Sequence, residues 1–122
     1  MSQVSDQPFE VRESAGLPVV VAPGEIDVRN SGQLRSALLR AQALNPVVVV
    51  DLSGTEFCDS SGLSVLVRAL RRTQADGGEV RLVVSTPAVL RILSVTGIGS
   101  IFSLFGSLQE ALAAPPPELA AP

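Results

Sequence analysis

Hydroxyl and acidic side chains gather in the segment CDSSGL, residues 58–63, which follows a nearly unbroken run of valines. Asp59, Ser60 and Ser61 precede an apolar repeat of helical period, and they suit two kinds of chemistry. They can cap the helix that follows, and the local sequence alone favours this structural interpretation. Alternatively, one serine is a phosphorylation site, because negative charge at a helix N-terminus is tolerated or stabilises by about 0.3–1 kcal/mol.

Several catalytic residue types are absent. The chain has no His and no Lys, and its nine basic residues are all Arg. These absences exclude a Ser–His–acid triad, a Lys Schiff base, a P-loop lysine and His-ligated metal sites. The single Cys58 cannot form an internal disulfide or a Cys-rich zinc site, so we expect no metal and no cofactor. Carboxylates alone could still act as acid and base, with Asp51, Glu56 and Asp59 as the candidates.

The composition indicates one small α/β domain. The chain has 122 residues, of which 46% are apolar, and its four Phe are its only aromatic residues. A net charge of −3 and the lack of stacking aromatics argue against nucleic-acid binding. The polar N-terminus does not resemble a signal peptide, and the longest apolar stretch is too short to cross a membrane. We therefore expect a soluble cytoplasmic protein with no membrane contact, and the free thiol agrees with a reducing compartment.

Apolar periodicity predicts the elements that position the serines. A hairpin begins the domain, with PFEVRES as an edge strand and LPVVVAP as its partner. Pro18 favours an edge or strand-start position. VVVVDL is apolar at successive positions and predicts a central strand covered on both faces. The remaining elements are expected to be helices at about 29–44, 60–75, 87–96 and 108–114, and strands at 79–84 and 101–103.

The order ββαβαβαβα predicts a mostly parallel, mixed sheet with a leading hairpin and about four helices. Residues 1–7 are expected to be a flexible N-terminus, 8–114 the domain, and 115–122 a disordered Pro/Ala tail. The loop 53–60 follows the carboxyl end of the central strand, where ligands and partners meet α/β sheets. Ser60 is therefore expected at an exposed helix N-terminus.

Three segments resemble the anti-sigma factor antagonist family, whose fold is the STAS domain. The first is GEIDVRNSGQLRSAL at 24–38, which is similar to the family's acidic loop and first helix. The second is VVVVDLSGTEFCDSSGLSVLVRALRRTQADGGEVRLV at 47–83, its central signature. The third is TPAVLRILSVTGIGSIFSLFGSLQEAL at 86–112, and the resemblance covers roughly 8–114. The combination is specific, although each fragment alone is weak.

The resemblance implies a phosphorylation switch in a chain that is not an enzyme. The unphosphorylated form would bind an anti-sigma factor that is also an ATP-dependent serine kinase. This binding would release a sigma factor from the anti-sigma factor. Phosphorylation would block binding, and a metal-dependent serine phosphatase would reset the switch. Motif positions imply Ser60 as the phosphorylated residue, with Ser61 as the fallback. The implied partner-binding residues are Glu25, Asp27, Asp59, Ser60, Ser61 and Gly62.

Two alternatives use the same sequence differently. A STAS domain can serve as an interaction module of a membrane transporter or a sensory complex. An enzyme would use the carboxylates named above, and it would need a deep pocket with perturbed acids. One departure from the family pattern is Asn30-Ser31-Gly32, which is expected to soften the first helical turn. Cys58 is expected to be a small core residue.

Overall fold

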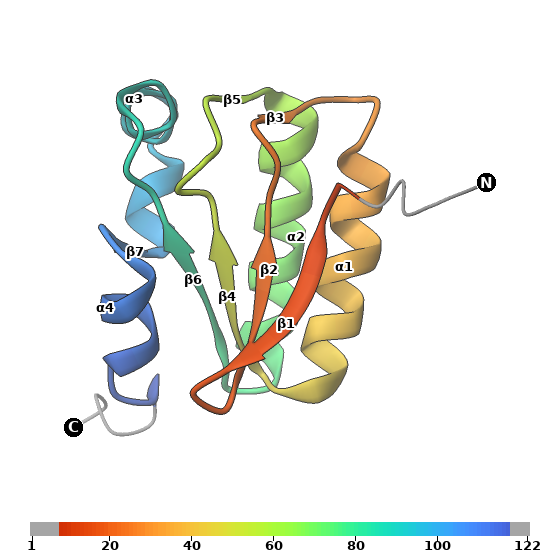
Figure 1. Ribbon diagram of the computed structural model, residues 1–122, viewed down its shortest axis with the longest axis vertical. Coiled ribbons are helices and arrows are strands. Elements are labelled where there is room, and N and C mark those ends of the chain that lie inside the picture. The colour runs from red at the N-terminus through yellow and green to blue at the C-terminus, as the bar shows by residue number, and fades with distance from the viewer. Residues whose placement is uncertain (1–7, 118–122) are drawn as a thin grey trace.

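A five-stranded mixed sheet forms the centre of the protein (Figure 1). The computed structural model describes residues 8–117. The first two strands form an antiparallel hairpin, and the other neighbours are parallel. In spatial order the strands are β1 (Glu10–Ser14), β2 (Leu17–Val21), β4 (Val47–Asp51), β6 (Glu79–Val83) and β7 (Ser103–Phe105). The predicted mixed sheet with a leading hairpin is confirmed.

Helices cover both faces of this sheet. Two long helices pack side by side against one face, and a short C-terminal helix packs on the other (Figure 1). The helices are α1 (Ser31–Leu44), α2 (Ser60–Ala75), α3 (Pro87–Thr96) and α4 (Leu108–Ala113), with a 3₁₀ turn, η1, at Ile98–Ile101. These four helices confirm the α/β fold class. No helix within residues 8–117 is long and apolar enough to cross a bilayer.

The valine strand β4 is the middle strand of the sheet, as its sequence predicts. It pairs in parallel with β2 on one side and β6 on the other. Val48 and Val50 lie in the core shared with α1 and α2, whereas Val49 lies in the smaller core beneath α4. Both faces of the strand are buried, which explains why apolar residues follow one another without alternation.

Two strands were not predicted. β3 (Glu25–Ile26) and β5 (Phe57–Cys58) have two residues each and form a separate parallel pair. Loops were expected there, because two residues are too few for a periodic signal. The last strand also begins two residues later than predicted, since η1 takes the preceding residues after Gly97 in the left-handed conformation (φ 75°).

Pro18 lies near the start of β2, as expected, but β2 lies inside the sheet between β1 and β4. Thr86 is the N-cap of α3 by position, but its hydroxyl donates to Thr55 O at 2.6 Å instead of capping the helix. Ser107 caps α4, accepting from Glu110 N at 3.2 Å. Residues 1–7 and 118–122 lie outside the described residues, so the predicted flexible N-terminus and disordered tail stay predictions.

A buried arginine ties α4 to the sheet, and the sequence did not reveal it. Arg81 points from β6 toward α4 with a side chain that is 2% exposed. Its guanidinium donates to Ala111 O at 2.6 Å, to Pro115 O at 2.9 Å and to Glu79 Oε1 at 2.6 Å. Ser103 donates to the other oxygen of Glu79 at 2.8 Å. This network satisfies carbonyls at the C-terminal end of α4, where a cation is favourable.

Candidate functional site

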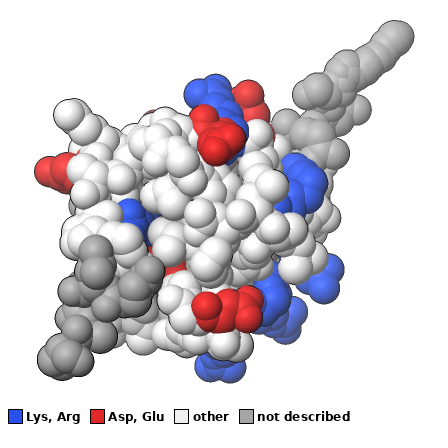
Figure 2. Space-filling model, turned by 90° about the horizontal axis from the view of Figure 1, so that it is seen from below, with Lys and Arg blue, Asp and Glu red and all other residues white. Residues whose placement is uncertain are grey.

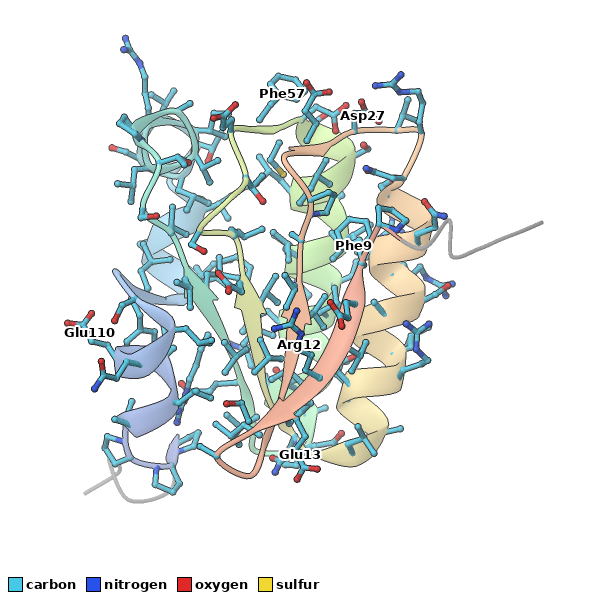
Figure 3. All side chains as sticks on the ribbon, in the orientation of Figure 1. Phe9, Arg12, Glu13, Asp27, Phe57 and Glu110 are labelled. Atoms are coloured by element: carbon cyan, nitrogen blue, oxygen red, sulfur yellow. The ribbon has the colours of Figure 1, made fainter. Side chains whose placement is uncertain are left out.

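The pairing of β3 with β5 creates the surface that contains Ser60. Ile26 lies opposite Cys58 in the parallel register, and Asp59 N donates to Ile26 O at 3.0 Å. The residue that follows each strand is an aspartate, so Asp27 and Asp59 lie at the same edge of the molecule. Figure 3 shows Asp27 and the exposed Phe57 at this same edge. Two segments that are about thirty residues apart in sequence therefore form one surface.

Asp59 caps α2. Its Oδ1 accepts from Ser61 N at 2.9 Å, from Gly62 N at 3.3 Å and from the Ser61 hydroxyl at 2.5 Å. These bonds, the Ser61 hydroxyl first among them, hold the pKa of Asp59 below its usual value, although desolvation and, to a smaller extent, the nearby Asp27 charge act against this. The carboxylate is thus held ionised at the helix N-terminus, where negative charge is favourable.

The two adjacent serines differ in what their hydroxyls do. Ser60 is the first residue of α2 and is exposed, and its hydroxyl makes no hydrogen bond within residues 8–117. Ser61 is partly buried and donates its hydroxyl to Asp59. Ser60 therefore has a free hydroxyl on a rigid helix end, while the hydroxyl of Ser61 is part of the cap.

Gly62 acts beneath this surface. It is buried, and a Cβ on it would lie 2.6 Å from Ile26 Cγ2 and 2.8 Å from Cys58 Sγ. Real side chains do not approach so closely, so the absence of a side chain lets α2 pack against β3 and β5. Of the six residues implied for partner binding, Gly62 is the one that is buried, and we expect it to act by positioning Ser60 and Ser61.

Arg29 organises the acidic loop before α1. Its guanidinium bonds Asp27 at 2.7 Å and lies 3.8 Å from Glu25. The hydrogen bonds from Arg29 are the main cause of the lowered pKa of Asp27. Asn30 closes the same loop, since its side chain accepts from Asp27 N at 3.0 Å and donates to Glu25 O at 2.9 Å. The departure from the family pattern at Asn30 thus orders the loop that leads into α1.

Exposed apolar side chains border the acids, and they were not predicted from the sequence. Val28 is 74% exposed and Phe57 is 47% exposed. The alternation within β5 is the signal that could have identified Phe57, because Cys58 points inward and its neighbour must point outward. A groove of about 350 Å³ begins at Ser60 and follows α2 toward the end of α3. Its lining residues are Ser60, Leu63, Ser64, Val67, Arg68, Arg71, Thr96 and Ile98.

The three carboxylates considered for catalysis have separate positions. Asp51 accepts from Ser53 N at 3.0 Å at the end of β4, and Glu56 is exposed in the following loop. Asp59 is held ionised by its capping bonds, which opposes a role as a proton donor. The groove at Ser60 has no Asp or Glu among its lining residues. Within residues 8–117, no group of His, Cys, Asp or Glu could hold a metal ion.

Cys58 lies in the core, as predicted, and we expect it to be unreactive. Burial, with a smaller contribution from the Asp59 charge, raises the pKa of its thiol to about 11. At pH 8 about one thiol in a thousand is then ionised, against roughly a quarter for a free cysteine of pKa about 8.5. A disulfide reagent at pH 8 should therefore label the folded protein slowly and the urea-unfolded protein rapidly. Rapid stoichiometric labelling of the folded protein would contradict the buried placement.

Known proteins share both the sequence pattern and the fold. The sequence model of the STAS domain matches residues 8–111. RsfB, an anti-sigma-F factor antagonist of Mycobacterium tuberculosis, is 33% identical over 105 residues, 84% of each chain. An anti-sigma factor antagonist from Mycobacterium paratuberculosis has a crystal structure with TM-score 0.77 and 32% identity, covering 85% of this chain and 89% of that one.

A more distant structure shares the fold alone. It is that of the Bacillus cell fate determinant SpoIIAA in its phosphorylated form, with TM-score 0.66 and 21% identity. The alignment covers 85% of this chain and 96% of that one. The family match, the two closer relatives and the fold agree: this chain belongs to the STAS domain family, among relatives that are anti-sigma factor antagonists.

Proposed function

We propose that this chain is an anti-sigma factor antagonist whose binding to an anti-sigma factor is switched off by phosphorylation of Ser60. The observation that carries the proposal is the exposed hydroxyl of Ser60 at the start of α2, which makes no hydrogen bond within residues 8–117 and follows Asp59, whose neighbour is the charge of Asp27. The family membership and the names of the relatives support the same function. In this proposal the surface around Ser60 is the surface that meets the partner.

Ser60 suits a kinase better than Ser61 does. Phosphorylation requires the serine oxygen to leave its own hydrogen bonds and approach the γ-phosphate of ATP. The Ser60 hydroxyl has no hydrogen bond to give up within the described residues, whereas the Ser61 hydroxyl would have to leave Asp59. Modification of Ser61 would also place a dianion against the Asp59 carboxylate that caps α2.

The phosphate would change the surface and leave the fold intact. A phosphoserine carries about −1.5 to −2 charges, and Ser60 lies at a helix N-terminus that favours negative charge. The phosphate would add its charge to those of Asp27 and Asp59, and its bulk would cover the neighbouring apolar surface. A partner fitted to the uncharged serine would lose its contact, and the relative SpoIIAA has this fold in its phosphorylated form.

The proposed cycle needs two enzymes besides this chain. The anti-sigma factor would act as a serine kinase and transfer the γ-phosphoryl group of ATP to the Ser60 oxygen, releasing ADP and the hydroxyl proton. A serine phosphatase would then hydrolyse the phosphoserine and restore binding. This chain would be the substrate in both steps, and we expect the exchange to occur in the cytoplasm.

Mapping of the phosphate tests the proposal. The purified chain is first used to capture an anti-sigma factor serine kinase. The captured kinase is then incubated with the chain and ATP, and the product is analysed by peptide mass spectrometry. We expect one phosphate per chain, on Ser60, and none on the Ser60→Ala variant. The matched variant Ser61→Ala should still be phosphorylated at Ser60. Phosphate on Ser61 in the wild-type protein would move the site, and failure to retain any anti-sigma factor would remove the proposed function.

A further inference from the structure

The two long helices carry arginines and no acidic residue. Figure 2 shows basic side chains gathered on the side of the molecule where these helices lie. This side is unusual, because the whole chain has a net charge of −3. The arginines of the two helices are Arg35 and Arg40 on α1, and Arg68, Arg71 and Arg72 on α2. None of them makes an ion pair within residues 8–117.

Arg72 lies partly buried in the groove between the two helices. Gln42 of α1 bridges the helices, donating to Ala69 O at 2.8 Å and accepting from Arg72 Nε at 3.0 Å. The Nη2 atom of Arg72 is buried and has no hydrogen-bond partner within the described chain. An unsatisfied buried donor is rare in native proteins, and a bound anion would supply the acceptor that this nitrogen lacks. The guanidinium of Arg72 is thus oriented by Gln42, and its Nη2 atom has no acceptor within the described chain.

Other arginines crowd the same place. Arg68 precedes Arg72 by one helical turn and also lines the groove that begins at Ser60, and Arg35 lies two turns before Gln42 on the same side of α1. Their positive charges, after burial itself, lower the pKa of Arg72. Asp76 lines the hollow of about 200 Å³ next to Arg72 but forms no ion pair with it. Like charges held this close repel one another, and an anion between them would relieve the repulsion.

We propose that the groove between α1 and α2 binds a multiply charged phosphate group, held by Arg35, Arg68 and Arg72. The guanidinium fork matches phosphate oxygens and stays charged at any physiological pH. The shielded Nη2 atom of Arg72 would gain its missing acceptor, and Arg35 and Arg68 would close on the same anion from the two helices. This site is separate from the proposed binding of an anti-sigma factor, so either can fail without the other.

Exposed arginines alone would not support this site. Arg91 of α3 is also exposed and without an ion pair in the described chain, but it has no oriented, shielded donor beside it. It is therefore the matched control, since Arg91→Gln removes the same charge from another surface. The phosphate could belong to a soluble compound or to a lipid headgroup, which present the same chemistry to the arginines.

Two probes distinguish these sources. Pyrophosphate is titrated into the full chain by calorimetry at constant ionic strength, and vesicles containing phosphatidylglycerol are tested by co-sedimentation. We expect saturable pyrophosphate binding with a Kd that rises about tenfold or more in Arg72→Gln and in Arg68→Gln. Arg91→Gln should stay within about twofold of the wild type. Arg68 is exposed, so its variant tests the site even if Arg72→Gln fails to fold.

Binding to the vesicles alone, lost in Arg68→Gln and kept in Arg91→Gln, would also support the site and assign it to a headgroup. Binding of neither probe would overturn the proposal. An equal loss in Arg91→Gln and Arg68→Gln would overturn it as well, because the attraction would then be the general field of the arginines.

Discussion

Ser60→Asp is expected to weaken binding of the anti-sigma factor several-hundred-fold without unfolding the protein. The carboxylate would stand on the exposed first residue of α2, beside the charges of Asp27 and Asp59. Loss of about 3–4 kcal/mol of contact energy corresponds to this change in Kd. The helix N-terminus accepts the added charge, so the Tm should remain near that of the wild type. Calorimetric titration and thermal unfolding of the same samples measure the two quantities.

Ser60→Asn and Ser60→Ala are the matched controls. Asn has the shape of Asp without its charge, and Ala removes the hydroxyl. If charge is the cause, Ser60→Asn should retain most of the binding and Ser60→Ala should bind constitutively in the presence of ATP. Equal loss in Ser60→Asn and Ser60→Asp would show that the partner excludes size rather than charge. Full binding by Ser60→Asp would refute the switch at this residue.

Arg81→Met is expected to cost about 3 kcal/mol of unfolding free energy. Met retains much of the buried volume, but it cannot donate to Ala111 O and Pro115 O at the end of α4. It also leaves Glu79, whose side chain is 21% exposed, without its counter-charge. Removing one partner of a buried ion pair costs about 3–5 kcal/mol, and 3 kcal/mol lowers the Tm of a domain of this size by roughly 10 °C or more. Urea unfolding gives the free energy directly.

Arg12→Met is a close control for this variant. Arg12 pairs with Glu10 at 3.0 Å across the same two-residue spacing on β1, but these side chains are about 60% exposed. An exposed pair contributes little, so stability should not change measurably. The double variant Glu79→Gln with Arg81→Met should recover part of the loss, because no buried charge is then left unpaired. Equal effects of Arg12→Met and Arg81→Met would contradict the role of burial.

Local periodicity was sufficient for most of the elements. The helix predicted at 60–75 is α2 with the same bounds, because its apolar stripe is regular and the segment before it caps it. The valine strand is central because only a doubly covered strand has successive apolar residues. The placement of Ser60 at an exposed helix end followed from these two elements alone.

The finer features of the site depended on contacts between distant segments. The sequence could not show which serine has a hydroxyl without a hydrogen bond, since the hydroxyl of either Ser60 or Ser61 could take part in capping α2. The β3–β5 pair brings Asp27 to Asp59, and two paired residues leave no pattern that could be recognised beforehand. That Gly62 is buried could likewise not be predicted from the sequence, because its burial follows from the closeness of Ile26 and Cys58.

The tripeptide Glu-Val-Arg shows where the sequence stops being informative. It occurs at the start of β1, Glu10 to Arg12, and at the start of β6, Glu79 to Arg81. The sequence determined that both copies are strands, because the alternation and the β-branched residue are local properties. Only the tertiary structure decided that the first arginine faces solvent and the second lies beneath α4. The physical reason is that burial depends on the element packed above the strand, and α4 comes from residues almost thirty positions later.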